Sequence, residues 1–335
     1  MEKKNIDWAN LGFGYIQTDK RYVSNYKNGA WDEGGLTDDA TVVINECAGV
    51  LQYAQTVFEG LKAYTTEDGH IVTFRPDLNA ERLEQSAKRP KERFIDAVTQ
   101  VVKANAAYVP PYGTGATLYI RPYLFGTNPV IGVKPADEYQ FRMFCTPVGP
   151  YFKGGAKPIT ICVSDFDRAA PHGTGHIKAG LNYAMSMHAI MEAHRNGFDE
   201  NMYLDAATRT KVEETGGANF LFVTKDGKVV TPKSDSILPS ITRRSLIYVA
   251  GEYLGLEVEE REVFFDEVKD FAECGLCGTA AVISPVGKIV DHGREICMPS
   301  GMEKMGPVIQ KLYDTLTGIQ MGRIEAPKGW IHVVE

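Results

Sequence analysis

Residues 176–183 read His-Ile-Lys-Ala-Gly-Leu-Asn-Tyr, and the interpretation of this stretch decides both the fold class and the chemistry. Most lysines are solvated surface charges, so Lys178 alone would carry little information. Two small residues follow it and an Asn-Tyr pair stands just downstream, which suits a positioned, reactive amine. The preceding Gly173-Thr174-Gly175 lacks the spacing of a Walker loop or of a dinucleotide fingerprint. Lys178 must therefore be judged by the other motifs of the chain.

Length and composition indicate an ordinary globular protein. The 335 residues are enough for two domains, with 44% hydrophobic and 24% charged residues. The net charge of -7 disfavours a nucleic-acid or acidic-membrane partner. Residues 1–7 have no apolar core of a signal peptide, and no apolar run approaches the length of a membrane span. The expected location is the cytoplasm.

The cysteine pattern is typical of packing rather than metal binding. Cys274 and Cys277 have Cys-x-x-Cys spacing, but no second pair or His pair at zinc spacing accompanies them. No metal site is therefore predicted. Free cysteine commonly behaves as a small buried hydrophobe, so packing is favoured, and a redox role for the two thiols stays open.

The first half of the chain mixes strands and helices. Runs rich in β-branched residues at 41–44 and 71–74 predict strands. Helices are predicted over 77–87 and over 91–107, the second ended by Pro110-Pro111. Residues 117–121 and 139–148 are predicted to be adjacent strands of one sheet.

A dense run of Gly and Pro at 149–158 predicts an interdomain loop between a small N-terminal domain, 1–148, and a large C-terminal domain, 159–335. The second domain is predicted to contain a strand at 159–163 and a hairpin turn at Asp226-Gly227. Helices are predicted over 182–196, 240–254 and roughly 305–318. This interleaving favours the α/β (α+β) class, with two domains and a cleft between them.

Several motifs meet the demands of pyridoxal phosphate chemistry, which needs an amine for the aldehyde, an acid for the ring nitrogen, a phosphate site and a carboxylate site. Glu213 or Glu214, ahead of a Gly-Gly turn, is a candidate acid. Residues 237–242 and 277–281 are candidate phosphate cradles, the first as a helix start. Arg121 is the odd charge in an apolar, aromatic strand and must be paired or functional if buried.

Taken together, these segments resemble the branched-chain amino acid aminotransferases, a family of fold-type IV pyridoxal phosphate enzymes. The resemblance runs from about residue 13 to 322, and its segments occur in the family's order: 57–64, 119–122, 176–183, 214–219, 238–243 and 278–281. It implies a two-domain architecture with the active site in the interdomain cleft.

The resemblance also implies a role for each matching residue. Lys178 matches the lysine that forms a Schiff base with the cofactor and moves the substrate proton. The implied cofactor-binding residues are Arg82, Lys178, Tyr183, Glu214, Ile241, Thr242 and Thr279. The implied substrate-binding residues are Phe13, Tyr53, Phe58, Tyr119, Arg121 and Ala280. Tyr53 matches a residue that reaches the neighbouring subunit's site, which implies a homodimer, and Tyr151 matches a mobile interdomain loop.

The implied reaction is transamination between L-leucine, L-isoleucine or L-valine and 2-oxoglutarate. A D-amino acid aminotransferase or an aminodeoxychorismate lyase of the same fold is the alternative. A cofactor-free binding protein is an alternative of another class. One methylene in an apolar pocket is worth only roughly 1–3 kcal/mol, so the preferred substrate cannot be predicted. The physiological direction and any assembly beyond a dimer also stay open.

Overall fold

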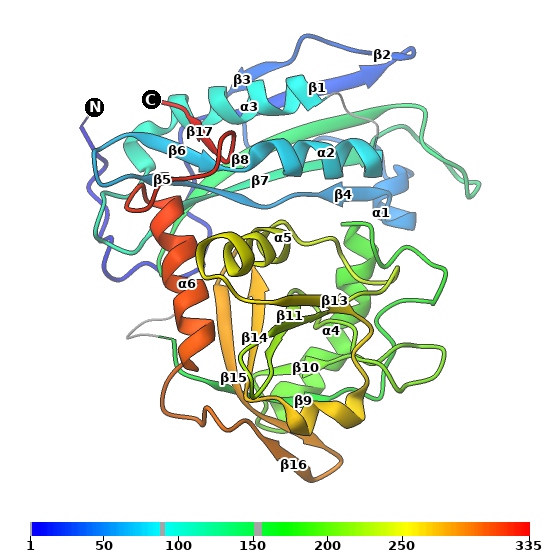
Figure 1. Ribbon diagram of the computed structural model, residues 1–335. Helices are drawn as coiled ribbons and strands as arrows, with labels where there is room; N and C mark the ends of the chain where they lie inside the picture. The colour runs from blue at the N-terminus through cyan, green and yellow to red at the C-terminus, as the bar shows by residue number, and fades with distance from the viewer. Residues whose placement is uncertain (1, 88–90, 151–155) are drawn as a thin grey trace. The chain divides into compact units, whose positions relative to one another are not determined.

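The computed structural model describes residues 2–87, 91–150 and 156–335, and the chain divides into two compact units (Figure 1). The first comprises Met1–Tyr151, Lys178–Leu181 and Ile319–Glu335. The second comprises Phe152–Ile177 and Asn182–Gly318. The main division thus falls within the Gly- and Pro-rich stretch, and each unit has its own sheet and core.

An antiparallel sheet forms the first unit, in the order β17-β6-β5-β7-β8-β1-β2, with β3 paired to β1 and β4 paired to β7. The strands are β1 (Arg21–Lys27), β2 (Ala30–Trp31), β3 (Gly35–Thr37), β4 (Thr56–Phe58), β5 (Leu61–Thr65), β6 (Ile71–Phe74), β7 (Thr117–Gly126), β8 (Tyr139–Val148) and β17 (Ile331–Val333). The helices are α1 (Gly49–Tyr53), α2 (Pro76–Ala87), α3 (Lys91–Ala104) and a 3-10 turn, Ala106–Tyr108.

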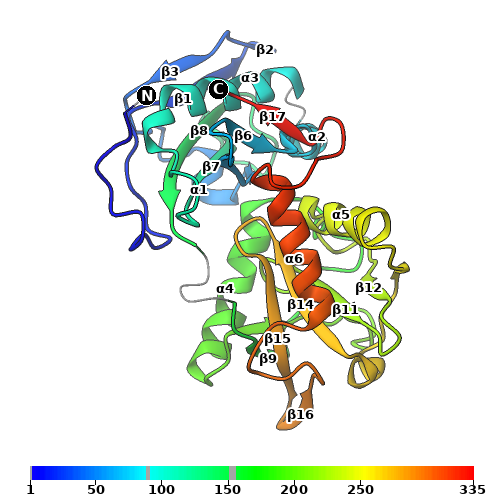
Figure 2. The same ribbon diagram turned by 60° about the vertical axis from the view of Figure 1, so that its left-hand side comes forward.

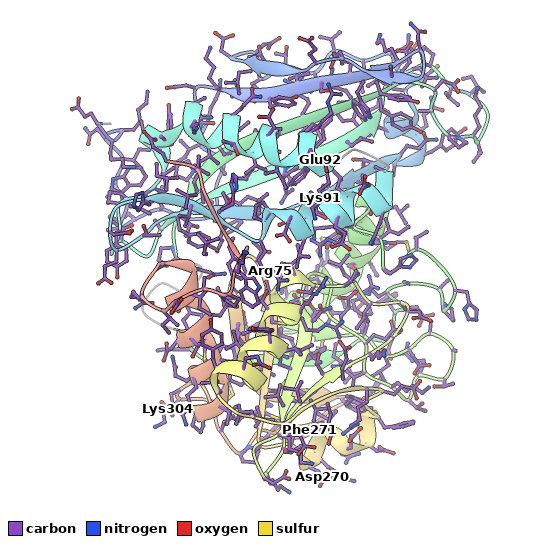
Figure 3. The ribbon with its side chains drawn as sticks, turned by 45° about the horizontal axis from the view of Figure 1, so that its top comes forward. Arg75, Lys91, Glu92, Asp270, Phe271 and Lys304 are labelled. Atoms are coloured by element: carbon purple, nitrogen blue, oxygen red, sulfur yellow. The ribbon has the colours of Figure 1, made fainter. Side chains whose placement is uncertain are left out.

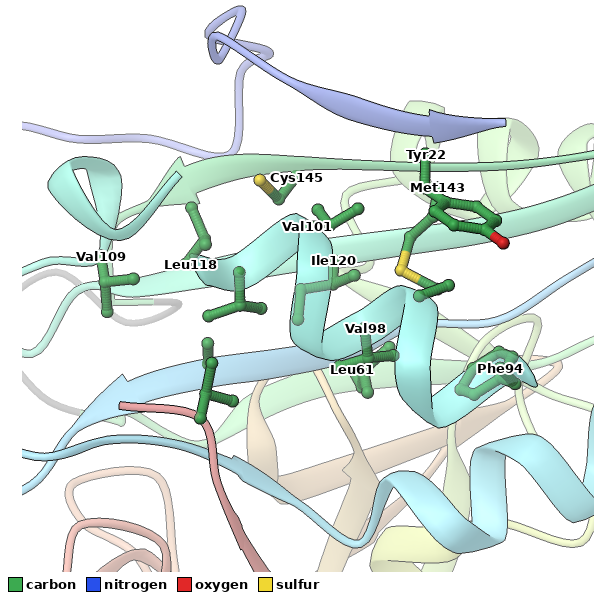
Figure 4. Close-up of a cluster of buried hydrophobic side chains, with 14 of the residues drawn as sticks. Tyr22, Leu61, Phe94, Val98, Val101, Val109, Leu118, Ile120, Met143 and Cys145 are labelled. Atoms are coloured by element: carbon green, nitrogen blue, oxygen red, sulfur yellow. The ribbon is translucent and has the colours of Figure 1, made fainter. Parts of the chain in front are cut away.

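The core of the first unit lies between α3 and one face of this sheet (Figure 4). Phe94, Val98 and Val101 recur at helical spacing on α3 and are fully buried. They pack with alternate residues of β7, Leu118 and Ile120. The intervening residues of β7 therefore face the other side of the sheet, which is where the candidate substrate residues lie.

The C-terminal tail completes the first unit. β17 pairs with β6 in antiparallel register, with Ile331 opposite Phe74. The guanidinium of Arg75, a residue labelled in Figure 3, lies 4.3 Å from the ring centroid of Trp330. The predicted domain bounds assigned residues 319–335 to the C-terminal domain; because of these contacts, the tail instead packs with the first unit.

A mixed sheet forms the second unit, in the order β10-β9-β15-β14-β11-β12-β13, with β16 on β15. The strands are β9 (Ile159–Val163), β10 (Glu200–Met202), β11 (Asn219–Val223), β12 (Val229–Pro232), β13 (Val258–Arg261), β14 (Glu273–Gly278), β15 (Val282–Asp291) and β16 (Arg294–Cys297). The helices are α4 (Gly180–Arg195), α5 (Ile241–Tyr248), a π-helical turn (Val249–Tyr253), a 3-10 helix (Phe265–Asp270) and α6 (Pro307–Gln320), as Figure 2 shows for α4 to α6.

The second core stacks aromatic rings on one face of that sheet. Phe222 lies between Phe220 and Phe271, at centroid distances of 5.5 and 4.7 Å. On β14, the buried Glu273 accepts hydrogen bonds from the backbone N–H groups of Val308 and Ile309, at 3.1 and 2.9 Å. This caps the first turn of α6 and fixes its start against the sheet.

Most elements predicted from sequence are present, with small differences at their ends. The strand predicted at 41–44 is wrong: these residues belong to no strand, and Val43 is 93% exposed. A β-branched run forms a strand only where a neighbouring strand pairs with it. The helix predicted over 91–107 ends at Ala104, and the one predicted over 240–254 continues past Tyr248 as a π-helical turn.

Candidate active site

Lys178 is held beside β4 by its backbone. The N–H of Phe58 donates to the Lys178 carbonyl at 3.0 Å, and Ala179 forms a bridge with Val57. A Cβ on Gly180 would lie 2.8 Å from Cγ2 of Thr56, too close for an ordinary contact. The small residues after the lysine are therefore explained: they let this segment approach β4 and fix where the amine leaves the backbone.

The Phe58 ring brings the amine and a guanidinium together. The Lys178 Nζ lies 4.7 Å from the ring centroid, and the Arg121 Cζ lies 4.9 Å from it. Arg121 also donates to the Tyr119 hydroxyl at 2.9 Å. Phe13 packs edge-on against Tyr119, at a centroid distance of 5.6 Å. The structure therefore brings five predicted residues to one face of the first sheet.

Arg82 is buried on α2, although its place in a polar helix would by itself indicate a solvated charge. It forms a two-bond ion pair with Glu59: Nε to Oε1 at 2.8 Å and Nη2 to Oε2 at 2.7 Å. Asn79 donates to the same carboxylate at 2.8 Å. Such a pair fixes the guanidinium plane. Its predicted contact with the phosphate stays a prediction.

Lys62 on β5 is a residue that the sequence analysis missed. It is buried and stands directly opposite Tyr119 in the antiparallel register, so both side chains lie on the same face. Burial lowers the pKa of its amine to about 8. Its signal in the sequence was the same as that of Arg121, a charge within an apolar strand.

Tyr53 is not part of this cluster. Tyr53, at the end of α1, donates its hydroxyl to the Ile131 carbonyl at 2.5 Å. It is half-buried, and its predicted role in a neighbouring subunit is not tested by a single chain. Tyr151 lies outside the described residues.

In the second unit, Asn182 organises the loop that leads to Lys178. Its Nδ2 donates to the Thr174 and Ile177 carbonyls at 2.7 and 2.8 Å. This explains the asparagine of the Asn-Tyr pair as a brace for the loop. Tyr183, the next residue on α4, is half-buried.

Glu214, rather than Glu213, has the surroundings of a fixed anion. Its carboxylate accepts from the Leu238 N–H at 2.9 Å and from Asn219 Nδ2 at 2.5 Å. Arg168 Nη2 lies 2.9 Å from its Oε1. Glu213 instead meets the Ser234 hydroxyl at 3.2 Å, and burial raises the pKa of its carboxyl. These donors favour Glu214 over Glu213 as the acid at the ring nitrogen, and that role stays a prediction.

Arg168 is the second residue that the sequence analysis missed. It is buried, and besides Glu214 its Nη2 donates to the carbonyls of Gly175 and Ser236. A Cβ on Gly175 would collide with the carbonyl oxygen of Ser236. The Gly-x-Gly that fits no phosphate loop is therefore needed for this close approach. Nothing in the sequence near Arg168 points to its partner, 46 positions away.

The two predicted phosphate cradles lie around the Glu214 turn. The Ser240 hydroxyl caps α5 by accepting a hydrogen bond from the Arg243 N–H at 3.2 Å. The N–H groups of Ile241 and Thr242 lie in the first turn of this helix, where an N–H has no acceptor within the helix. The β14–β15 turn holds Thr279 and Ala280, and a Cβ on its Gly278 would lie 3.6 Å from the Gly217 carbonyl. These turns therefore gather at one edge of the second sheet.

This set of residues fits pyridoxal phosphate. A buried carboxylate with three donors can hold a protonated ring nitrogen, and first-turn amides beside a hydroxyl can hold a phosphate dianion. The two features lie on one rigid sheet edge, linked through the Leu238 N–H. A generic reactive lysine would need neither of them.

The comparisons with known proteins agree with this chemistry. Residues 56–289 match the family model described as amino-transferase class IV. The chain is 52% identical to the branched-chain-amino-acid aminotransferase of Haemophilus influenzae, over 99% of this chain and 100% of that protein. It is 47% identical to that of Helicobacter pylori, over 99% and 98%. The chain belongs to the branched-chain amino acid aminotransferases.

Solved structures of branched-chain amino acid aminotransferases share the fold. That from Thermobaculum terrenum, in its PLP form, has a TM-score of 0.78 at 28% identity and covers 96% of this chain and 100% of that one. That from Escherichia coli has a TM-score of 0.77 at 27% identity, over 95% and 99%. The predicted two-domain fold-type IV class and the pyridoxal phosphate cofactor are thereby confirmed.

The Cys-x-x-Cys of this aminotransferase lies on β14. Cys274 and Cys277 are both buried, and their separation of three residues puts them on opposite faces of the strand. Burial raises the pKa of the Cys277 thiol to about 12 and that of Cys274 still further. Packing rather than redox chemistry follows from this placement.

Among the described residues, no helix combines the length and the apolar character needed to cross a membrane.

Proposed function

We propose that this enzyme transfers the amino group of L-leucine, L-isoleucine or L-valine to 2-oxoglutarate, giving the branched-chain 2-oxo acid and L-glutamate. The observation that carries the proposal is the Phe58 ring, with the Lys178 amine 4.7 Å and the Arg121 guanidinium 4.9 Å from its centroid. An amino acid substrate needs an amine that accepts protons, a cation for its carboxylate and an apolar wall for its side chain.

The residues divide the work by their chemistry. Pyridoxal phosphate supplies the aldehyde and an electron-withdrawing ring. Lys178 holds the cofactor and moves the proton at the substrate Cα. Glu214 would keep the ring nitrogen protonated, and the Arg168 guanidinium, 2.9 Å from its Oε1, would hold the carboxylate in place. Arg82, with the first-turn amides of Ile241 and Thr242 and with Thr279, would hold the phosphate.

The substrate contacts follow from the face of the first sheet. Arg121 and Tyr119 would orient the α-carboxylate, and the buried Lys62 opposite Tyr119 adds a second positive charge on that face. Phe13 and Phe58 would line an apolar side-chain pocket, and the backbone of Ala280 would contribute a donor. Such a pocket cannot reject one branched aliphatic chain in favour of another by a large factor.

Kinetics with L-leucine and D-alanine test the activity. With 2-oxoglutarate as acceptor, kcat/KM for L-leucine is expected to exceed that for D-alanine, and Lys178→Ala is expected to abolish turnover. Faster turnover of D-alanine would favour the D-amino acid alternative, and full activity of Lys178→Ala would overturn the assignment of the amine.

We also propose a homodimer in which Tyr53 serves the partner's site. What supports it is the resemblance, in which Tyr53 matches a residue that reaches the neighbouring subunit's site. Tyr53→Ala and Lys178→Ala are each expected to be inactive. Mixed and refolded together, they should regain activity, because one site of each heterodimer would then have both residues. Absence of activity in a confirmed heterodimer would contradict this role of Tyr53.

The cytoplasmic location stays a prediction.

A further inference from the structure

Glu59 lies in the tripeptide Phe58-Glu59-Gly60, where β4 ends, and this tripeptide touches two parts of the candidate active site. The N–H of Phe58 donates to the Lys178 carbonyl at 3.0 Å. A Cβ on Gly60 would collide with the Tyr119 hydroxyl. Glu59 itself is only 1% exposed. The backbone that carries this buried carboxylate is therefore packed against both the lysine segment and the substrate strand.

Both the backbone and the side chain of Glu59 are held within the first unit. Its N–H donates to the Pro122 carbonyl on β7 at 2.8 Å. Its carboxylate accepts from Asn79 Nδ2 at 2.8 Å, and from Arg82 through Nε at 2.8 Å and Nη2 at 2.7 Å. Asn79 is buried as well and also donates to the Gly60 carbonyl at 3.3 Å. A carboxylate held from two sides has one orientation, and it imposes that orientation on the guanidinium.

Glu59 thereby sets the direction in which the Arg82 guanidinium can serve a second anion. A guanidinium has five N–H donors in one plane, and Glu59 engages the edge formed by Nε and Nη2. The donors of the opposite edge must then point away from Glu59, within the plane that the ion pair fixes. An arginine without this brace would have to be ordered by its ligand, which lowers affinity. The pair is therefore suited to present a preformed donor edge to an anion.

We propose that Glu59 is a positioning residue for the cofactor phosphate and acts through Arg82. The role rests on the proposed contact between Arg82 and the phosphate. Glu59 does not bind the phosphate itself, because two anions repel each other. It holds the guanidinium at the angle at which the remaining N–H groups meet the phosphate oxygens. A pair kept only for stability is the competing explanation, and it would need no fixed donor edge, since apolar residues of the same volume often serve a fold as well.

Cofactor binding with and without a phosphate tests the role of Glu59. The full chain is titrated with pyridoxal phosphate and with pyridoxal, which lacks the phosphate, and the visible absorption of the bound cofactor gives each dissociation constant. Glu59→Asp keeps the negative charge but withdraws it by one methylene, so that the two-bond pairing with Arg82 is lost. It is expected to raise the dissociation constant of pyridoxal phosphate by about tenfold, the lower end of what orienting residues contribute at metal sites, and to leave that of pyridoxal unchanged. Asn79→Ala, which removes only the third donor to the carboxylate, is expected to act in the same direction and more weakly.

Glu273→Asp is the matched control, because Glu273 is also buried and its carboxylate accepts from two backbone N–H groups at the start of α6. It should lower the melting temperature and leave the ratio of the two dissociation constants as in the wild type. Equal weakening of both cofactors by Glu59→Asp, or no weakening of either, would overturn the positioning role. Arg82→Lys distinguishes this role from the phosphate contact. If Arg82→Lys raises the ratio and Glu59→Asp does not, only the role of Glu59 fails, whereas an unchanged ratio in Arg82→Lys would contradict the phosphate contact itself.

Discussion

Removal of the Arg168 guanidinium is the sharpest test of how Glu214, the proposed acid at the ring nitrogen, is held. Arg168→Met removes the guanidinium paired with the buried Glu214 carboxylate and leaves the neutral donors of Leu238 and Asn219 in place. Breaking a buried ion pair by removing one partner costs about 3–5 kcal/mol. The carbonyls of Gly175 and Ser236 lose their donor as well, at about 1 kcal/mol each. The expected loss in the free energy of unfolding is therefore at least about 3 kcal/mol.

Urea unfolding of the four proteins in a double-mutant cycle measures this loss. The double variant with Glu214→Gln is expected to recover about 2 kcal/mol or more relative to the sum of the single changes, because the uncompensated charge is gone. Both Arg168→Met and the double variant are expected to lose activity, the former on the order of 10–100-fold if Arg168 acts as orienting residues do at metal sites. Additive stability changes, or a stable Arg168→Met with full activity, would refute the reasoning.

Three further predictions follow from other residues. Burial lowers the pKa of Lys62 from 10.5 to about 8, so between these pH values the unfolded chain binds a proton that the folded chain does not. The free energy of unfolding of the wild type should therefore rise by about 2–3 kcal/mol between pH 8 and 10.5. Lys62→Met should lack this rise when unfolding is measured with urea. Gly180→Ala should reduce turnover far more than Gly251→Ala, since only the first new Cβ meets an atom within 4 Å; equal turnover would contradict the placement of the lysine segment. Because Cys274 and Cys277 are buried on opposite faces, activity should be the same in reduced and oxidised glutathione buffers, and a reversible loss would contradict packing alone.

The sequence was most informative where a residue departs from its local pattern. Arg121 in an apolar strand, and Lys178 beside two small residues, could both be recognised without coordinates, because burial of a cation requires a reason. The same rule applied to Lys62 and was not used. The strand predicted at 41–44 failed for the opposite reason, since β-branched residues carry no information on whether a pairing partner exists.

Partners far apart in the chain could not be predicted in this way. Arg168 reaches Glu214, and Glu59 reaches Arg82, through pairings set by the fold rather than by any local spacing. Even the resemblance to a known family gave only the residues expected to touch the cofactor. The arginine and glutamate behind them became visible with the structure.

These hidden partners explain why the candidate site is built as it is. Glu214 and Arg82 are each members of an ion pair buried in their own unit, and a buried ion pair is seldom the most stable choice for a core. Replacing either pair with apolar residues of the same volume could keep or raise stability, as observed for such pairs elsewhere. Such a substitution would remove a charged group held in a fixed orientation. A cofactor with a cationic ring nitrogen and an anionic phosphate needs one carboxylate and one guanidinium of this kind. If Glu214 and Arg82 hold the cofactor as proposed, that role explains why buried ion pairs stand here in place of apolar residues.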